Sequence, residues 1–325
     1  MTQTSEQLIF GTDYLKPKQT TNIRFADRVY GGVCPGDKTC IRKKADGNED
    51  AMGMIRLPNG HAILLVADSH FGALASKEAL SRFSEVFNQT SGSPDQRLFE
   101  THLRLDKLVR KTRQTFTPIN CSTTLISVYV EPGTAWWCNT GDSHLMLHRN
   151  GNLQMRSEHH PALFVGDDMA HSQHVFNELE RLGVTDVMTD PDNLHPIAFK
   201  LSQLGQDIRS DNADSDQIKQ IIDQITKLAD LDFPIPTEAI AQPWHELHQI
   251  MQYAPHHGRF LLHEGDRLLL ASDGIDADVS GIELEDIETV LNKHTDIEDT
   301  AKALLKAATT RKGCNDNLMF LLAAV

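Results

Sequence analysis

Acidic residues stand at or beside the ends of several apolar stretches of this 325-residue chain. They are Glu49, Asp50, Asp68, Asp142, Asp273 and Asp316. Asp68 directly follows "AILLVA", and Asp273 directly follows "RLLLAS". One acid at the end of a strand is usually a turn residue. So many in one chain indicate that they share a role.

Such acids converge at one rim if their strands lie in stacked sheets. Two like charges 4 Å apart repel by about 4 kcal/mol at an effective dielectric constant near 20, so a group of them requires protonation or a cation. The donor set is oxygen only, which favours Mg²⁺ or Mn²⁺ over Zn²⁺. Two such ions sharing a carboxylate would bind and deprotonate a bridging water, which could then attack phosphorus.

The elements that position these acids follow from apolar patterning and turn signals. Strands are predicted at 52–57, 61–67, 122–130, 135–140, 144–148, 152–156, 259–263, 267–272 and 318–325. Helices are predicted at 73–88, 95–116, 283–294 and 297–310. Short connections such as "PNG" and "EPGT" require antiparallel neighbours. Antiparallel strands with helices gathered in pairs predict an α+β layered sandwich.

Residues 1–325 are interpreted as one domain, in which 157–256 form an elaborated middle segment or lid. The alternative is a separate small domain. The formal net charge of −14 argues against nucleic acid and anionic membranes as partners. Five scattered cysteines, with no secretory leader and no long apolar stretch, favour a cytoplasmic protein. The sequence leaves the oligomeric state open.

Several motifs, read in order after "NED", resemble the metal-dependent protein serine/threonine phosphatases of the PP2C type. They are "VADSHFG", "STTLISVYV…AWWCNTGDSHLML", "EGDRLLLASDGI" and "NDNLMFLLAAV". The resemblance covers roughly residues 43–156 and 257–325. It implies a four-layer αββα sandwich, in which two antiparallel sheets lie between pairs of antiparallel helices. That fold agrees with the order of elements predicted above.

The resemblance also implies a role for each acid. Asp68 would bridge two Mn²⁺ or Mg²⁺ ions, and the backbone carbonyl of Ser69 would contact one of them. Asp273 and Asp316 would hold the other ion.

Three further acids and a histidine complete the site that the resemblance implies. Asp50, with Glu49 beside it, would act directly or through water, and Asp142 would lie near a third, more weakly held ion. His70, two residues after the bridging acid, would protonate the leaving alkoxide. An imidazolium is a suitable donor near neutral pH. The alternative for His70 is a turn histidine bonded to backbone.

Two positions depart from the family pattern. Ser69 stands where glycine is usual, and glycine tolerates positive φ and leaves room for metal. Ala45 stands where an arginine binds the substrate phosphate. The neighbouring Arg42, Lys43 and Lys44 are candidates to replace it, although lysine offers a point charge in place of a bidentate fork. The alternative for these three is a solvated basic patch.

The sequence therefore predicts a phosphatase that acts on phosphoserine or phosphothreonine in a phosphorylated protein partner. Two alternatives remain. One is a catalytically weak or inactive PP2C-like module that binds or regulates a partner. The other keeps the chemistry but acts on a small phosphomonoester.

Overall fold

The structure, a computed structural model, describes residues 4–16, 19–36, 47–70, 72–116, 122–157, 255–277, 280, 282–310 and 316–325. The expectation of a middle segment or lid at 157–256 therefore lies outside the described residues except at its two ends. The basic candidates Arg42, Lys43 and Lys44 lie outside them as well.

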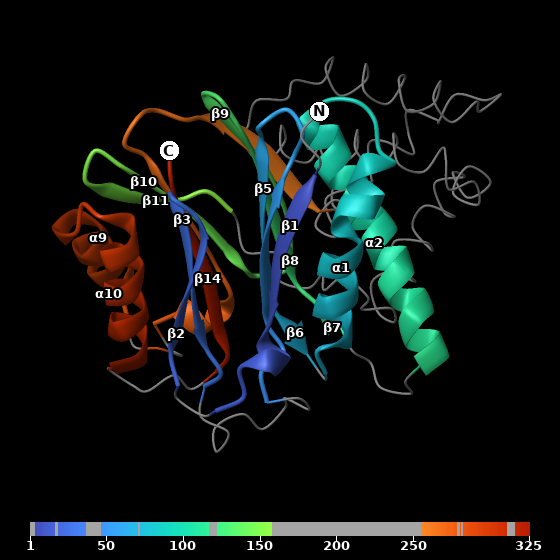
Figure 1. The fold of residues 1–325 in the computed structure, drawn as a ribbon, viewed down its shortest axis with the longest axis horizontal. Helices are drawn as coiled ribbons and strands as arrows, with labels where there is room; N and C mark the ends of the chain where they lie inside the picture. The colour runs from blue at the N-terminus through green and yellow to red at the C-terminus, as the bar shows by residue number, and fades with distance from the viewer. Residues whose placement is uncertain are drawn as a thin grey trace, which may run out of the picture. The chain divides into compact units, whose positions relative to one another are not determined.

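Two six-stranded antiparallel sheets form the centre of the described fold (Figure 1). The first has the order β1 (Ser5–Phe10), β4 (Ala51–Arg56), β5 (Ala62–Ala67), β8 (Leu125–Glu131), β9 (Thr134–Thr140) and β12 (His256–Leu261). The second has the order β11 (Asn152–Met155), β10 (His144–Arg149), β13 (Arg267–Ala271), β14 (Leu318–Ala324), β3 (Val29–Cys34) and β2 (Thr21–Ala26). The short strands β6 (Ser69–His70) and β7 (Ser122–Thr123) pair separately.

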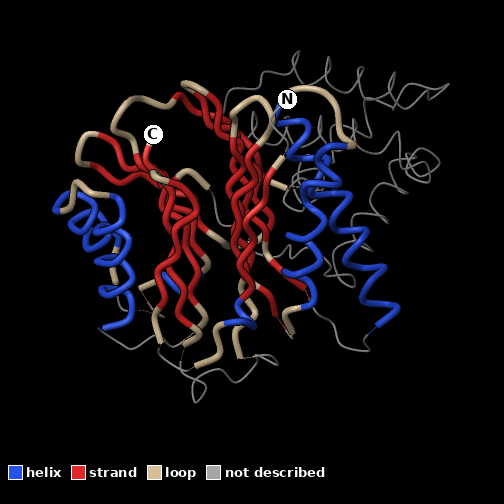
Figure 2. The backbone as a smooth tube through the Cα atoms, viewed as in Figure 1, coloured by secondary structure: helices blue, strands red, loops and turns tan. Residues whose placement is uncertain are grey.

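Helices cover the outer face of each sheet (Figure 2). The pair α1 (Leu74–Asn88) and α2 (Pro94–Phe116) packs on the first sheet. The pair α9 (Leu284–Lys293) and α10 (Ile297–Thr310) packs on the second. Two short 3-10 helices, η1 (Gly11–Asp13) and η2 (Asp273–Ile275), complete the described elements. The predicted α+β fold with four αββα layers is thus confirmed.

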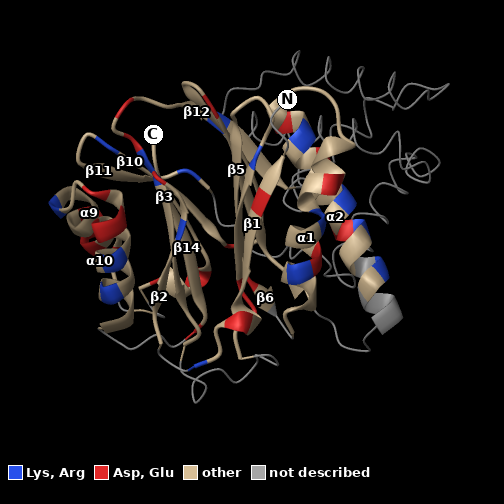
Figure 3. Ribbon diagram, viewed as in Figure 1, with Lys and Arg blue, Asp and Glu red and all other residues tan. Residues whose placement is uncertain are grey.

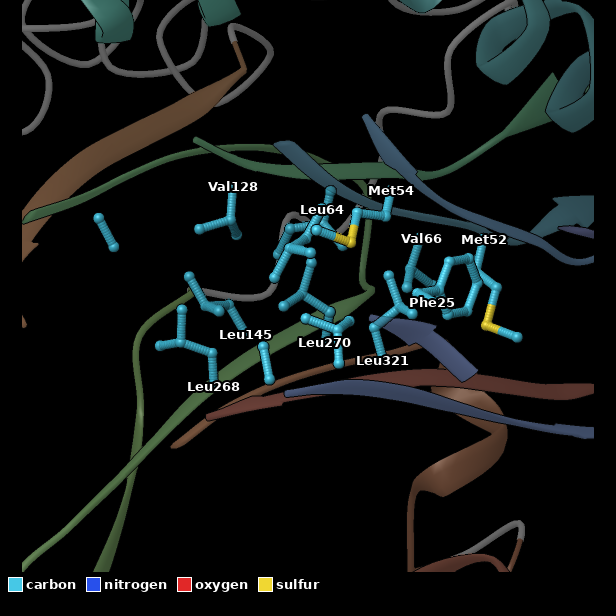
Figure 4. Close-up of a cluster of buried hydrophobic side chains, with 14 of the residues drawn as sticks. Phe25, Met52, Met54, Leu64, Val66, Val128, Leu145, Leu268, Leu270 and Leu321 are labelled. Atoms are coloured by element: carbon cyan, nitrogen blue, oxygen red, sulfur yellow. The ribbon is translucent and has the colours of Figure 1, made fainter. Parts of the chain in front are cut away.

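Side chains alternate between two buried environments along the central strands. Leu64 and Val66 of β5 and Leu268 and Leu270 of β13 join the apolar cluster between the sheets (Figure 4). Leu269, between the last two, faces the helices instead. Because successive residues of a strand point to opposite faces, a strand covered on both faces is apolar throughout. This explains why these strands appear as continuous apolar runs in the sequence.

Strands β1, β2, β3 and the short β6 were not predicted. The strand β3 has the sequence "VYGGVC", whose two glycines are unfavourable in a strand. Gly32 is required there by packing, because a Cβ at this position would lie 2.3 Å from the Phe320 ring. From residue 52 onward the predicted elements agree with the observed ones to within a few residues. Among the described residues, no helix combines the length and apolarity that crossing a membrane requires.

A buried histidine lies between α2 and the first sheet. His102 is 1% exposed, and its ring nitrogens lie 2.9 Å from Thr140 Oγ1 and 2.8 Å from Ser127 Oγ. Burial lowers the pKa of His102 from 6.5 to about 3. The folded protein therefore holds this imidazole neutral over a pH range in which an unfolded chain would protonate it.

His102 should make stability depend on pH on the acid side. As the pH falls below 6.5, His102 binds a proton in the unfolded chain but stays neutral in the folded protein until the pH reaches about 3. The free energy of unfolding therefore falls by up to about 1.4 kcal/mol per pH unit over this range. Between pH 7 and pH 5, the free energy of unfolding measured in urea should fall by about 2 kcal/mol less in His102→Gln than in the wild type. Equal losses in the two proteins would contradict this.

Candidate active site

Strand register brings the predicted acids to one end of the sandwich. Ala51 pairs with Ala67, so Asp50 and Asp68 lie next to each other beyond the ends of β4 and β5. In the second sheet His144 pairs with Ala271, which brings the turn holding Asp142 near the residues that follow β13. Ala271 also pairs with Phe320, so the start of β14 reaches the same end.

We call this region, where Asp50, Asp68, Asp142, Asp273 and Asp316 lie, the acidic end. Figure 3 shows acidic segments at the end of the sheets marked by β6.

Threonine hydroxyl and amide groups hold the backbone of Asp68. Its N–H donates to Thr124 Oγ1 at 2.9 Å, and its carbonyl accepts from Thr124 N–H at 2.8 Å and from Thr123 Oγ1 at 3.0 Å. Thr124 Oγ1 also lies 2.7 Å from Ser143 Oγ, beside Asp142. Asp68 is 1% exposed, and these hydrogen bonds hold its backbone in place.

Ser272 connects the two sheets at this end. Its hydroxyl donates to Asp50 Oδ2 at 2.8 Å, and its N–H donates to the Met319 carbonyl at 3.0 Å. Asp50 lies at the start of β4 in the first sheet, whereas Ser272 follows β13 in the second. Because Asp273 directly follows Ser272, this hydroxyl sets the position of Asp50 relative to Asp273.

Glu49 is held through its backbone. Its N–H donates to Asn317 Oδ1 at 2.9 Å, and its carbonyl accepts from Ser76 Oγ at 2.6 Å. Ser76 N–H in turn donates to Ser69 Oγ at 2.9 Å, at the start of α1. The acid-bearing segments are therefore joined to each other by neutral donors.

Asp273 shows that the carboxyl groups of the acidic end are close together. Burial, followed by the charges of Asp68, Asp142 and Asp316, raises the pKa of Asp273 to about 11. Its side chain is partly exposed, but Oδ1 is buried and accepts no hydrogen bond from an N–H or hydroxyl of the described residues. A nearby cation would relieve this repulsion.

The donor set suits a hard divalent cation. Carboxylate oxygens supply it, which is the chemistry that Mg²⁺ and Mn²⁺ prefer. Among the described residues, no three His, Cys, Asp or Glu side chains already enclose a position for an ion.

A histidine and a carboxylate form a second contact between the same segments. His144 Nε2 lies 2.6 Å from Asp276 Oδ1, and the His144 side chain is 3% exposed. His144 follows the turn that holds Asp142, and Asp276 follows η2. This pair joins the loop of Asp142 to the loop of Asp273.

The structure describes most, but not all, of the residues predicted for the site. Ser69 replaces the usual glycine without strain, because Asn150 is the one described non-glycine residue with positive φ. His70 is described in its backbone alone, where it pairs with Ser122 in the short β6–β7 sheet.

Five polar residues that hold the acids were not predicted. They are Ser76, Thr123, Thr124, Ser272 and Asn317. Ser272 and Asn317 each adjoin an acid in the sequence and lie beside an apolar strand, which is the signal that could have identified them.

Comparison with known proteins places this chain in a family. Residues 39–319 match the family model of protein phosphatase 2C. A bacterial serine phosphatase shares the fold, with a TM-score of 0.56 and 17% identity over 92% of this chain and 98% of that one. No sequence among the curated proteins matches significantly.

Two further solved structures share the fold. The serine/threonine phosphatase of S. agalactiae has a TM-score of 0.53 and 15% identity over 99% of this chain and 100% of that one. The serine/threonine phosphatase PstP/Ppp of Mycobacterium tuberculosis has a TM-score of 0.53 and 16% identity over 92% and 98%.

The fold and the acidic end together define a phosphatase-like α+β sandwich. The chain belongs to the protein phosphatase 2C family, whose model covers most of its length.

Replacing Asp273 by a residue that does not ionise should stabilise the metal-free protein at neutral and basic pH. Because the folded pKa of Asp273 lies above its ordinary 3.8, the fold loses stability as the pH rises above 3.8 and the unfolded chain ionises. Asp273→Asn should therefore raise the midpoint of thermal unfolding at pH 8 in the presence of EDTA, and raise it less at pH 5.

The matched control is Asp276→Asn, which removes a charge three residues away but also the contact with His144. It should not raise the midpoint. An Asp273→Asn protein less stable than the wild type at pH 8 without metal would contradict the assignment of repulsion to this cluster.

Proposed function

We propose that this chain is a Mn²⁺- or Mg²⁺-dependent phosphatase that hydrolyses phosphoserine and phosphothreonine in proteins. One observation supports this most directly. The carboxyl groups of Asp68, Asp142 and Asp316 lie close enough to Asp273 to oppose its ionisation. Acids held in this way by neutral donors are suited to binding divalent cations. When bound, two such ions supply a nucleophile from water at neutral pH and neutralise charge on the phosphoryl group.

The residues of the chain have separate tasks in this proposal. Asp68 would be shared by the two ions, Asp273 and Asp316 would hold one of them, and the Ser69 carbonyl would contact the other. Glu49 and Asp50 would complete the site directly or through water, and Asp142 would lie near a third ion.

The substrate side of the site rests on basic residues and one histidine. Arg42, Lys43 and Lys44 would bind the substrate phosphate in place of the arginine that Ala45 replaces. His70 would donate a proton to the departing serine oxygen, which leaves poorly as an alkoxide. Its position next to Ser69 and two residues beyond Asp68 supports this role.

Two alternatives to this function can be distinguished by experiment. A non-catalytic PP2C-like module would bind a partner without turnover. A small-molecule phosphatase would hydrolyse free phosphomonoesters in preference to phosphopeptides. We also infer a cytoplasmic location from the cysteine content.

Purified protein should hydrolyse p-nitrophenyl phosphate and phosphothreonine peptides when Mn²⁺ is added, and EDTA should abolish this. Asp273→Asn should lower kcat/KM by at least about 10²-fold, because it removes a proposed ligand. Asp299→Asn, which removes an exposed acid in the first turn of α10, is the control and should retain most activity. Absence of both turnover and Mn²⁺ binding in the wild type would favour the non-catalytic module.

A change at His70 should affect substrates according to their leaving groups. His70→Gln should lower kcat for a phosphoserine peptide by about 10²-fold or more, since the alkoxide needs a proton. The loss on p-nitrophenyl phosphate should be much smaller, because p-nitrophenolate is a stable anion. Equal losses on both substrates would show that His70 is not the proton donor.

A further inference from the structure

Asn317 is a buried asparagine that joins three separate segments at the acidic end. It is 0% exposed and directly precedes β14. Its Nδ2 donates to the carbonyls of Pro35 at 2.8 Å and Gly47 at 3.0 Å. Its Oδ1 accepts from Glu49 N–H at 2.9 Å. Both amide hydrogens and the amide oxygen are therefore used, so the side chain has one orientation.

The backbone of Asn317 contacts the remaining acids. Its N–H donates to Asp316 Oδ1 at 2.7 Å, which orients that carboxylate. Its carbonyl packs against Gly274, where an added Cβ would lie 2.0 Å from the oxygen. Gly274 follows Asp273, so this close contact with Asn317 sets how near the segments that carry Asp273 and Asp316 lie to each other.

We propose that Asn317 is the positioning residue of the metal site, acting through Asp316, Glu49 and the segment beside Asp273. This proposal rests on the proposed function. Residues that orient metal ligands typically alter metal affinity by about 10–100-fold when changed.

The variant Asn317→Asp separates positioning from electrostatics, because the two predict opposite signs. The aspartate side chain retains an acceptor for Glu49 N–H but offers at most one hydrogen where Asn317 donates two. An added negative charge alone would strengthen Mn²⁺ binding. Loss of positioning would weaken it, and we expect the Kd for Mn²⁺ to rise about 10–100-fold. Free Mn²⁺ measured by electron paramagnetic resonance gives this constant without any assay of activity.

Asn292→Asp is the matched control. Asn292 Nδ2 also donates to a backbone carbonyl, that of Gly151 at 2.9 Å, and its Oδ1 lies 3.0 Å from His148 Nε2. His148 lies on β10 four residues beyond His144, away from the acidic end. This variant should lose thermal stability but keep the wild-type Kd for Mn²⁺. Thermal melts identify the folded fraction of each protein. Asn317→Ser is a second variant, without added charge, and it should raise the Kd for Mn²⁺ as Asn317→Asp does.

The outcomes are distinct. Wild-type or tighter Mn²⁺ binding by folded Asn317→Asp and Asn317→Ser would overturn the positioning role while leaving the proposed function intact. A wild-type protein that binds no Mn²⁺ would overturn the proposed function and this inference together. Equal weakening in Asn292→Asp would show that general destabilisation, and not positioning by Asn317, controls the affinity.

Discussion

Repulsion among carboxyl groups at one end of the β-sandwich is the constraint on which the rest of the site depends. Each pair of like charges a few ångströms apart costs about 4 kcal/mol even at an effective dielectric constant of 20. Hydroxyls and amides hold the acid-bearing backbone at this end, as Thr124 does for Asp68 and Asn317 does for Glu49. Neutral donors of this kind fix position and leave the negative charge available to a ligand.

The two stacked sheets must keep one position relative to each other for this site to exist. Asp50 and Asp68 belong to the first sheet, whereas Asp273 and Asp316 adjoin strands of the second. The apolar cluster between the sheets sets their separation, and Ser272 joins them directly at the acidic end. Packing in the core and chemistry at the rim are therefore linked, because a shift of one sheet along the other would separate the acids.

Membership of the protein phosphatase 2C family gives the fold its context, and the departure from the family pattern at Ser69 has a local explanation. Ser69 has no positive φ, and its hydroxyl accepts a hydrogen bond from Ser76 N–H, so the extra side chain takes part in holding the start of α1. His144 makes a contact with Asp276 that joins the two loops of the second sheet at the acidic end.

The sequence by itself determined the types of element, the α+β class and the acids, since apolar periodicity and turn residues are local signals. It did not reveal β3, because Gly31 and Gly32 lower strand propensity and are needed only for packing against Met52 and Phe320. Nor did it reveal the residues that hold the acids, such as Thr124, Ser272 and Asn317. Their partners lie tens to hundreds of positions away along the chain, so only the tertiary structure, through strand register and the stacking of two sheets, decided which side chains meet.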